Sequence, residues 1–244
     1  MIKVTAVVPT FNEAGNIAAL VRELFSQALP GLNILIVDDA SSDGTAEIAD
    51  GLASEHRGRL SVLHRQGSRG LGRAYVDGFR LALEEGSDII VQMDADFSHA
   101  PADVPRLTAA LEEADVAVGS RYAEGGRLDE TWGAGREALS RWANLYVRSI
   151  LRIRVKDATA GFKAWRRSAL LALDVGRVRS NGYIFQVEMA YLSERLGLRV
   201  AEVPIYFAER KAGESKMSAG VKLEAAVGVF RILLKHGRLR RPGR

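Results

Sequence analysis

The strongest constraint on the fold is a regular alternation of short apolar runs with amphipathic segments between residues 2 and 119. Short β-branched apolar runs predict buried strands, and apolar residues spaced three and four apart predict helices. The predicted strands are residues 2–8, 32–37, 60–64, 88–93 and 116–119, and the predicted helices are residues 16–28, 45–56, 74–85 and 101–114. Strands that are apolar throughout need cover on both faces. We therefore expect an α/β fold, with a mostly parallel sheet and helices on both faces.

The second half of the chain has fewer clear patterns. Residues 122–135 are rich in glycine and lack periodicity, so we expect a flexible loop there. Beyond it, apolar spacing predicts a helix at 138–153, a strand at 199–207 and an amphipathic helix at 218–236. The expected division is a main domain, residues 1–217, followed by a C-terminal amphipathic basic helix and tail, residues 218–244.

The composition excludes several kinds of active site. The chain has no cysteine, which removes disulfides, thiol nucleophiles and cysteine-ligated metals. None of its four histidines lies four residues from another, so a bound metal would be a hard cation held by oxygen. No apolar run approaches the ~18 residues that span a membrane, and no signal-peptide pattern is present. We therefore expect a cytoplasmic protein without a transmembrane segment.

Positive charge is concentrated towards the C-terminus. Residues 199–244 contain 11 Lys and Arg against 4 Asp and Glu, although the net charge of the whole chain is only +4. A basic end indicates an anionic partner, such as a membrane surface, a phosphate-bearing substrate or nucleic acid. A solvated charged end is the plain alternative. Aromatic residues are sparse among these basic residues, which argues against base stacking and therefore against nucleic acid.

Charged side chains follow several of the predicted strands. Ligands of open α/β sheets bind beyond the carboxyl ends of the strands, and those ends carry Glu13, Asp39, Asp94, Asp96 and Arg121. Asp94 and Asp96 are one residue apart, so an extended strand places both on one face. Adjacent carboxylates repel each other unless a cation lies between them. A solvated strand end also explains the pair, but the convergence of several strand ends favours a site for Mg²⁺ or Mn²⁺.

Two further segments are candidate anion sites. The glycine-rich residues 67–72 precede a helix, but they follow the third strand and lack the spacing of a dinucleotide-binding loop. We interpret them as a turn with accessible backbone amides. Arg210 and Lys216 flank a short Gly/Ser segment, which suits either a phosphate clamp or an ordinary exposed basic loop.

An ordered set of motifs covers nearly the whole chain, from residue 4 to about residue 218. The motifs are PTFNE, VDDASSDGT, MDADFSH, GSRY, DATAGFKAWR, GYIFQVEM and FAERKAGESKMS. Single motifs are moderately specific, but the ordered set resembles family 2 glycosyltransferases with a GT-A fold. Within that family the chain is most similar to polyprenol-phosphate (dolichol-phosphate) mannose synthases.

The resemblance implies roles for particular positions. It assigns nucleotide-sugar binding to Pro9, Phe11, Glu13, Val37, Asp39, Asp94, Ala95, Asp96, Arg121, Arg210 and Lys216. It assigns the metal to Asp94 and Asp96, with Ser98 as a weak third ligand where several relatives have glutamine. Relatives usually have tyrosine at the position of Phe11, so a stacking face is kept and a hydroxyl is lost.

Three of the implied residues would act in catalysis. They are Asp96, Arg121 and Arg136, with the two arginines near the transferring phosphate. Arg210 and Lys216 match a mobile loop that closes over the donor. Residues 1–217 would then form the GT-A catalytic domain.

The implied activity is metal-dependent, inverting transfer of mannose from GDP-mannose to a polyprenyl (dolichyl) monophosphate, by a protein bound peripherally to the membrane surface. Two alternatives stay open. One is glucosyl transfer from UDP-glucose to a polyprenyl phosphate, and the other is a non-catalytic module that binds membranes through its basic tail. A processive polysaccharide synthase is disfavoured, because the chain has neither a Q-x-x-R-W motif nor predicted membrane helices.

Overall fold

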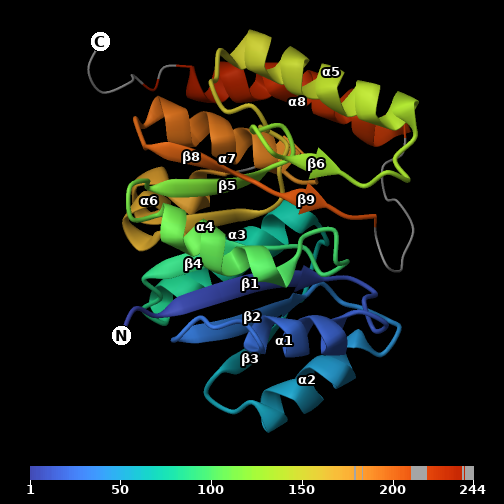
Figure 1. The fold of residues 1–244 in the computed structure, drawn as a ribbon, viewed down its shortest axis with the longest axis vertical. Helices are drawn as coiled ribbons and strands as arrows, with labels where there is room; N and C mark the ends of the chain where they lie inside the picture. Colours follow the sequence, from blue (N-terminus) through green and yellow to red (C-terminus); the bar gives the residue numbers. More distant parts are fainter. Residues whose placement is uncertain (179, 183, 210–218, 238, 240–244) are drawn as a thin grey trace.

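A computed structural model describes residues 1–178, 180–182, 184–209, 219–237 and 239, with residues 219–226 as helical backbone only. A seven-stranded sheet runs through the protein in the order β3-β2-β1-β4-β7-β5-β8 (Figure 1). Its strands are β1 Val4–Thr10, β2 Leu32–Asp38, β3 Leu60–His64, β4 Ile89–Gln92, β5 Val116–Ser120, β7 Lys163–Arg166 and β8 Val200–Pro204. Neighbouring strands are parallel except at β7, which runs antiparallel between β4 and β5.

Helices cover both faces of this sheet. On one face lie α1 Ile17–Phe25, α2 Thr45–Glu55, the 3₁₀ helix η1 Pro101–Asp103 and α4 Val104–Ala110; on the other lie α3 Leu71–Glu84, α6 Arg167–Leu173, η2 Val175–Arg177 and α7 Ile184–Arg195. Within β1, Val4, Ala6 and Val8 pack into the first layer and Val7 packs into the second. Successive side chains of a strand point to opposite faces, so a fully apolar strand supplies both layers. The expected α/β fold is confirmed.

A further layer lies at one end of the molecule. There α5 Ala134–Leu151 and α8 Ala219–His236 lie side by side, and α8 also contacts α7 (Figure 1). Val147, Val229 and Ile232 belong to their shared hydrophobic core. The predicted C-terminal helix is therefore present, and one of its faces packs against the body of the protein.

Four elements of the second half have no counterpart in the sequence predictions, namely β7, α6, η2 and α7. The four residues of β7 begin with Lys163 and end with Arg166, so they form no apolar run. Residues 184–193 of α7 are buried on every side, which removes the amphipathic period that marks a surface helix.

Two predicted segments differ in detail from the structure. The predicted flexible loop at 122–135 contains β6 Arg127–Leu128, which pairs with β9 Tyr206–Phe207 in a two-stranded sheet. The predicted strand at 199–207 is consequently divided between β8 and β9, because its last residues leave the main sheet to pair with β6.

Gly78 sets how closely α3 approaches the sheet. A Cβ atom at this position would lie 2.5 Å from Cγ1 of Val7 and 2.9 Å from Cγ2 of Val37. Both valines are completely buried, so neither has space to move. Gly51 in α2 has no neighbouring atom within 4 Å of the same position and provides a matched control.

We expect Gly78→Ala to lower the free energy of unfolding by about 1–3 kcal/mol, because the added methyl group overpacks the core. Gly51→Ala should raise it by about 0.5–1 kcal/mol, because alanine is the better helix former. Urea-induced unfolding of both variants checks this. Equal changes in the two variants would show that α3 has room to shift.

Candidate active site

The predicted site residues gather at one edge of the main sheet. Because β1 lies between β2 and β4, the carboxyl ends of these three strands are neighbours. Pro9 lies within β1, and Phe11 and Glu13 follow it; Val37 lies in β2, which Asp39 follows; and Asp94, Ala95 and Asp96 follow β4. The chain order of the strands reverses at β1, and crevices at such reversals are where open α/β sheets bind ligands.

Hydrogen bonds hold the two loops of the proposed nucleotide region together. The backbone N–H of Glu13 donates to Thr45 Oγ1 at 2.8 Å, and the backbone N–H of Asn12 donates to Ser41 Oγ at 3.0 Å. Ser42 N–H in turn donates to Asn12 Oδ1 at 2.9 Å. Asn12 has a φ of 58°, a left-handed conformation that asparagine tolerates better than most residues. The loop after β1 is therefore fixed against the loop after β2.

Asp39 is buried, and both its carboxylate oxygens have partners in the protein. One accepts a hydrogen bond from Arg65, and the other accepts the Gly70 N–H at 2.7 Å. The predicted turn at 67–72 therefore presents a backbone amide to a carboxylate of its own chain. Arg69, from the same turn, lies over the Phe11 ring with its guanidinium carbon 4.5 Å from the ring centroid.

The two acidic residues after β4, Asp94 and Asp96, accept hydrogen bonds from different partners. Asp94 Oδ1 accepts the hydroxyl of the buried Tyr75 at 2.7 Å. Asp96 Oδ1 accepts the Ser98 hydroxyl at 2.6 Å and the Ser98 N–H at 3.0 Å. Ser98 thus lies beside Asp96, where its hydroxyl donates to the carboxylate. The backbone of Gly161 lies against Asp94, since a Cβ there would be 3.1 Å from Asp94 Oδ2.

Neutral groups surround Asp94. Burial, followed by the charge of Asp94, raises the pKa of Tyr75 well above its ordinary value, so the hydroxyl keeps its proton. Burial lowers the pKa of His99, although the neighbouring carboxylates act in the opposite direction. Its Nδ1 accepts the backbone N–H of Asp94 at 3.3 Å, as only an uncharged imidazole can do.

Asp94 and Asp96 suit a cation that takes its other ligands from water and from substrate phosphates. Among the residues that the structure describes, no group of three or more His, Cys, Asp or Glu is placed to hold a metal. Mg²⁺ is commonly held by only one or two carboxylates, together with water and substrate phosphates. Asp94 and Asp96 fit that kind of open site rather than a closed structural one.

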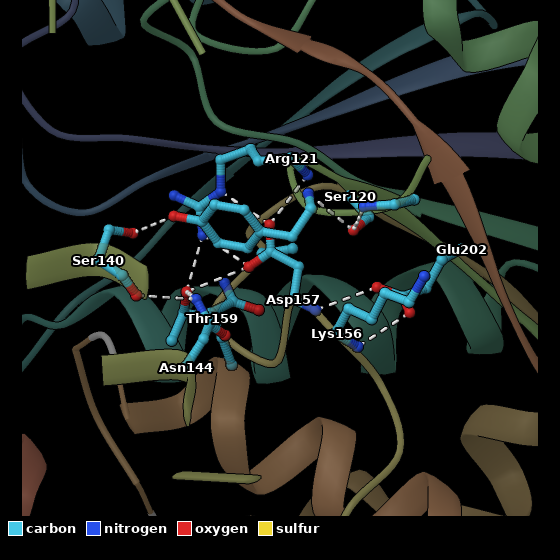
Figure 2. A network of polar contacts seen from close by, with 12 residues as sticks. Ser120, Arg121, Ser140, Asn144, Lys156, Asp157, Thr159 and Glu202 are labelled. Atoms are coloured by element: carbon cyan, nitrogen blue, oxygen red, sulfur yellow. Dashed lines mark hydrogen bonds and ion pairs between the residues drawn. The ribbon is translucent and has the colours of Figure 1, made fainter. Parts of the chain in front are cut away.

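Arg121 forms a buried ion pair with Asp157, a residue that the motif roles did not include (Figure 2). Its Nε and Nη2 donate to the two carboxylate oxygens, each at 2.7 Å, and Nη2 also donates to Thr159 Oγ1 at 2.7 Å. Burial by itself would raise the pKa of Asp157, but the Arg121 guanidinium outweighs it and holds that pKa below its usual range. The backbone N–H of Asp157 donates to Glu202 in β8 at 3.0 Å.

Arg136 lies in the first turn of α5 and is half exposed. Its Nη1 contacts Glu209 Oε2 at 2.5 Å, and its guanidinium carbon lies 3.7 Å from the centroid of the Trp132 ring. Ring contacts connect the two arginines. The Trp132 ring packs perpendicular to the Phe207 ring, and the Phe207 ring centroid lies 5.2 Å from the Arg121 guanidinium carbon.

An open pocket adjoins these residues. Its volume is about 320 Å³, and its basic lining residues are Arg121, Arg127 and Arg141. The other two predicted cationic residues, Arg210 and Lys216, lie outside the described residues.

Lys163 is a completely buried cation that the sequence reasoning did not single out. Its Nζ donates to the carbonyl oxygen of Ala160 at 2.6 Å and to Gln186 Oε1 at 2.7 Å, and Gln92 Nε2 donates to the same amide oxygen. Lys163 therefore connects Ala160, in the segment between Asp157 and Gly161, to Gln186 of α7. The lysine of the DATAGFKAWR motif could have drawn attention to this position. Its burial was not predictable, because it depends on strand β7, which the sequence patterns did not predict.

A known protein family matches most of this chain. Residues 5–173 match the model of Glycosyl transferase family 2. The chain belongs to glycosyltransferase family 2. The resemblance drawn from the motifs is thereby confirmed, and the protein is a glycosyltransferase.

Curated relatives cover most of the chain. It is 44% identical over 229 residues to an undecaprenyl-phosphate mannosyltransferase of Micrococcus luteus, covering 94% of this chain and 93% of that protein. It is 43% identical over 220 residues to the polyprenol monophosphomannose synthase of Mycolicibacterium smegmatis, covering 90% and 82%. It is 35% identical over 247 residues to a dolichol-phosphate mannosyltransferase of Pyrococcus furiosus, covering 98% and 66%.

Solved structures share the fold. Glucosyl-3-phosphoglycerate synthase of Mycobacterium tuberculosis, in complex with Mn²⁺, UDP and phosphoglyceric acid, has a TM-score of 0.68 to this protein and is 21% identical. The match covers 99% of this chain and 80% of that one. At this level of identity the likeness shows the GT-A architecture alone.

The buried lysine predicts a pH dependence of stability. Burial lowers the pKa of Lys163 to about 7 from its ordinary 10.5. Between these values the unfolded chain binds more protons than the folded protein, so stability rises with pH across the window. Lys163→Met removes this contribution. The stability of the wild type relative to Lys163→Met should therefore increase by up to about 1.4 kcal/mol per pH unit above about pH 7.

Urea-induced unfolding at several pH values between neutrality and about pH 10 measures this difference. Lys156→Met, which replaces an exposed lysine, is the matched control. A difference between the wild type and Lys163→Met that stays constant with pH would contradict the prediction.

Proposed function

We propose that the protein transfers mannose from GDP-mannose to a polyprenyl monophosphate, with inversion at the anomeric carbon. The observation that carries the proposal is the identity of 44% to an undecaprenyl-phosphate mannosyltransferase over 94% of this chain. The neighbouring acidic pair and arginines support it, because the reaction brings two phosphate-bearing substrates together.

The donor would bind across the ends of β1, β2 and β4. The base and ribose would lie against the loops of Phe11 and Asp39, which requires Asp39 to exchange its contacts with Arg65 and Gly70 for contacts with the nucleotide. Asp94 and Asp96 would hold Mg²⁺ or Mn²⁺. When bound, this cation supplies positive charge to the diphosphate of the donor. Arg210 and Lys216 would stabilise the same diphosphate as it leaves.

The acceptor phosphate would bind at Arg121 and Arg136. The guanidinium groups offer fixed hydrogen-bond geometry to phosphate oxygens, and they reduce the repulsion between two anionic substrates. Asp157 fixes the orientation of the Arg121 guanidinium. The second pKa of a phosphate monoester is about 6, so its oxygen is already a competent nucleophile at neutral pH. No strong general base is required, which agrees with a neutral and buried His99.

The layer of α5 and α8 would face the membrane that contains the acceptor. Among the side chains that the structure describes, seven of the eleven exposed large hydrophobic residues lie on these helices: Leu139, Trp142, Leu145, Val227, Phe230, Leu233 and Leu234. An exposed apolar concentration of this kind marks an interaction surface. Arg141 and Arg231 are exposed among these residues, so the surface suits anionic lipid.

This surface extends the membrane role proposed for the C-terminal segment. No helix among the described residues is long and apolar enough to cross a bilayer. Four arginines of the basic C-terminal tail lie outside the described residues: Arg238, Arg240, Arg241 and Arg244. We propose that they also contact the membrane surface.

We expect Asp96→Ala to reduce mannosyl transfer by about 10²–10³-fold, because a diphosphate that leaves without its stabilising charge raises the barrier by several kcal/mol. Transfer from GDP-mannose to a short-chain polyprenyl phosphate is measured with Mn²⁺, with Mg²⁺ and after chelation, and a parallel assay supplies UDP-glucose. Asp50→Ala, at an exposed ion pair with His64, is the control variant.

The assay separates the alternatives. Near-normal turnover of Asp96→Ala would remove the metal assignment. Transfer from UDP-glucose but not from GDP-mannose would identify UDP-glucose as the donor, and no transfer from either would contradict the proposed reaction.

Replacing both Trp142 and Leu145 with serine should weaken vesicle binding at least tenfold. These side chains are 58% and 61% exposed, and burying one apolar side chain contributes about 1.5–3 kcal/mol. Co-sedimentation with phosphatidylcholine–phosphatidylglycerol vesicles at low salt measures the effect. Leu171→Ser replaces a leucine of α6 that is 55% exposed and should bind like the wild type. Equal binding by all three proteins would exclude this surface.

A further inference from the structure

One contact joins the proposed acceptor site to the segment after β9. Arg136 Nη1 and Glu209 Oε2 lie 2.5 Å apart, although the two residues are 73 positions apart in the chain. Their side chains are 45% and 40% exposed, so both groups can be reached from solvent. A guanidinium proposed to bind the acceptor phosphate is therefore already in contact with an anion of its own chain.

The main chain around Glu209 is fixed independently of this contact. The backbone N–H of Glu209 donates to Asp129 Oδ2 at 3.3 Å, and the Tyr206 hydroxyl donates to the same oxygen at 2.8 Å. The side chain and backbone N–H of Thr131 donate to Oδ1 of Asp129, and these hydrogen bonds lower the pKa of Asp129. The Glu209 carboxylate can thus leave Arg136 by rotation of its side chain alone.

The guanidinium is also held in place without Glu209. It lies flat enough against Trp132 to bring its central carbon within 3.7 Å of the ring centroid. A cation–π contact of this kind stays when the carboxylate leaves. Arg136 is therefore a preorganised anion site, and another anion can replace the Glu209 carboxylate there.

Whether an incoming anion displaces the Glu209 carboxylate from Arg136 depends on the negative charge of that anion. Half-exposed ion pairs contribute little to stability, so the carboxylate is easily displaced. A phosphate monoester carries nearly two negative charges and three acceptor oxygens at neutral pH, and it binds a guanidinium better than a carboxylate does. A phosphodiester has lost one of those charges.

The proposed reaction converts the acceptor from a phosphomonoester into a phosphodiester and so removes one negative charge from its phosphate. One oxygen of the acceptor phosphate forms a bond to the anomeric carbon, and the bond from that carbon to the GDP oxygen breaks. The electron pair of the broken bond leaves with GDP, which gains a negative charge, while the acceptor becomes a phosphodiester with one charge fewer. No proton, oxidant or further reactant is needed for this balance.

We propose that Glu209 competes intramolecularly for the anion site on Arg136, so that it admits the phosphomonoester acceptor and promotes release of the phosphodiester product. The acceptor displaces the carboxylate, and the carboxylate returns to Arg136 once transfer has reduced the charge on the lipid phosphate. The proposal rests on the function proposed above. Glu209 lowers the affinity of the site for every anion, so the strongly bound monoester is still admitted while the weakly bound diester is released.

Binding of inorganic phosphate tests the competition without any transfer reaction. Calorimetric titration of Glu209→Gln should give a dissociation constant about two- to fivefold lower than that of the wild type, as expected for the loss of a weak ion pair. The gain should be lost in the double variant Glu209→Gln/Arg136→Gln. Asp174→Asn removes a carboxylate from another exposed arginine pair and should bind phosphate like the wild type.

Kinetics with lipid substrates test the consequence. Glu209→Gln should lower the KM for polyprenyl phosphate and the inhibition constant of the phosphodiester product by the same factor, about two- to fivefold, because one intramolecular competitor weakens every ligand of the site equally. A role in folding alone would lower the amount of active enzyme without strengthening inhibition by the product. Phosphate binding that is no tighter in Glu209→Gln, or product inhibition that is no stronger, would overturn the proposal.

The two proposals can fail separately. Tighter phosphate binding by Glu209→Gln without mannosyl transfer by the wild type would support the competition and contradict the assigned reaction. Mannosyl transfer by the wild type with unchanged phosphate binding in Glu209→Gln would support the reaction and overturn the role of Glu209.

Discussion

The buried ion pair of Arg121 and Asp157 connects the parts of the active site. It joins the end of β5 to residues 157–161, the segment that places Gly161 against Asp94 and then enters β7. A buried pair is favourable only when hydrogen bonds offset the desolvation of both charges. Here the Asp157 carboxylate accepts hydrogen bonds from the side chain and backbone of Arg121 and from Thr159. This network fixes the distance between the proposed acceptor site and the acidic pair.

The hydrogen-bond partners of Asp94 hold this residue in place without carrying a positive charge. Tyr75 donates a hydrogen bond from a neutral hydroxyl, and the neutral His99 accepts the backbone N–H. Neutral partners orient a carboxylate without cancelling its charge. The Arg121 guanidinium is paired with Asp157 instead. Among these contacts no cation is paired with Asp94, which agrees with the proposed role of its carboxylate in binding a cation.

The sequence was most informative where local patterns decide structure. Continuous apolar runs predicted strands at the positions of β1 to β5, and the parallel arrangement placed Asp39, Asp94 and Asp96 at one edge of the sheet. The Arg121–Asp157 pair was not predictable in the same way. The two residues are 36 positions apart, and their meeting depends on β7 entering the sheet. Lys163 was missed because a lysine in a four-residue strand has no apolar signature, although its surroundings bury it completely.

The position of β7 also sets the order in which the strands can pair while the protein is being synthesised. Within the main sheet β5 pairs only with β7 and β8, and both follow it in the chain. The first four strands, by contrast, pair among themselves. As the chain leaves the ribosome, a β3-β2-β1-β4 sheet can therefore form early, with β4 as an open edge, while β5 waits without a partner. Unpaired edges and apolar strands of this kind promote aggregation. Until residues 163–166 emerge, the nascent chain therefore has both an open β4 edge and an unpaired β5.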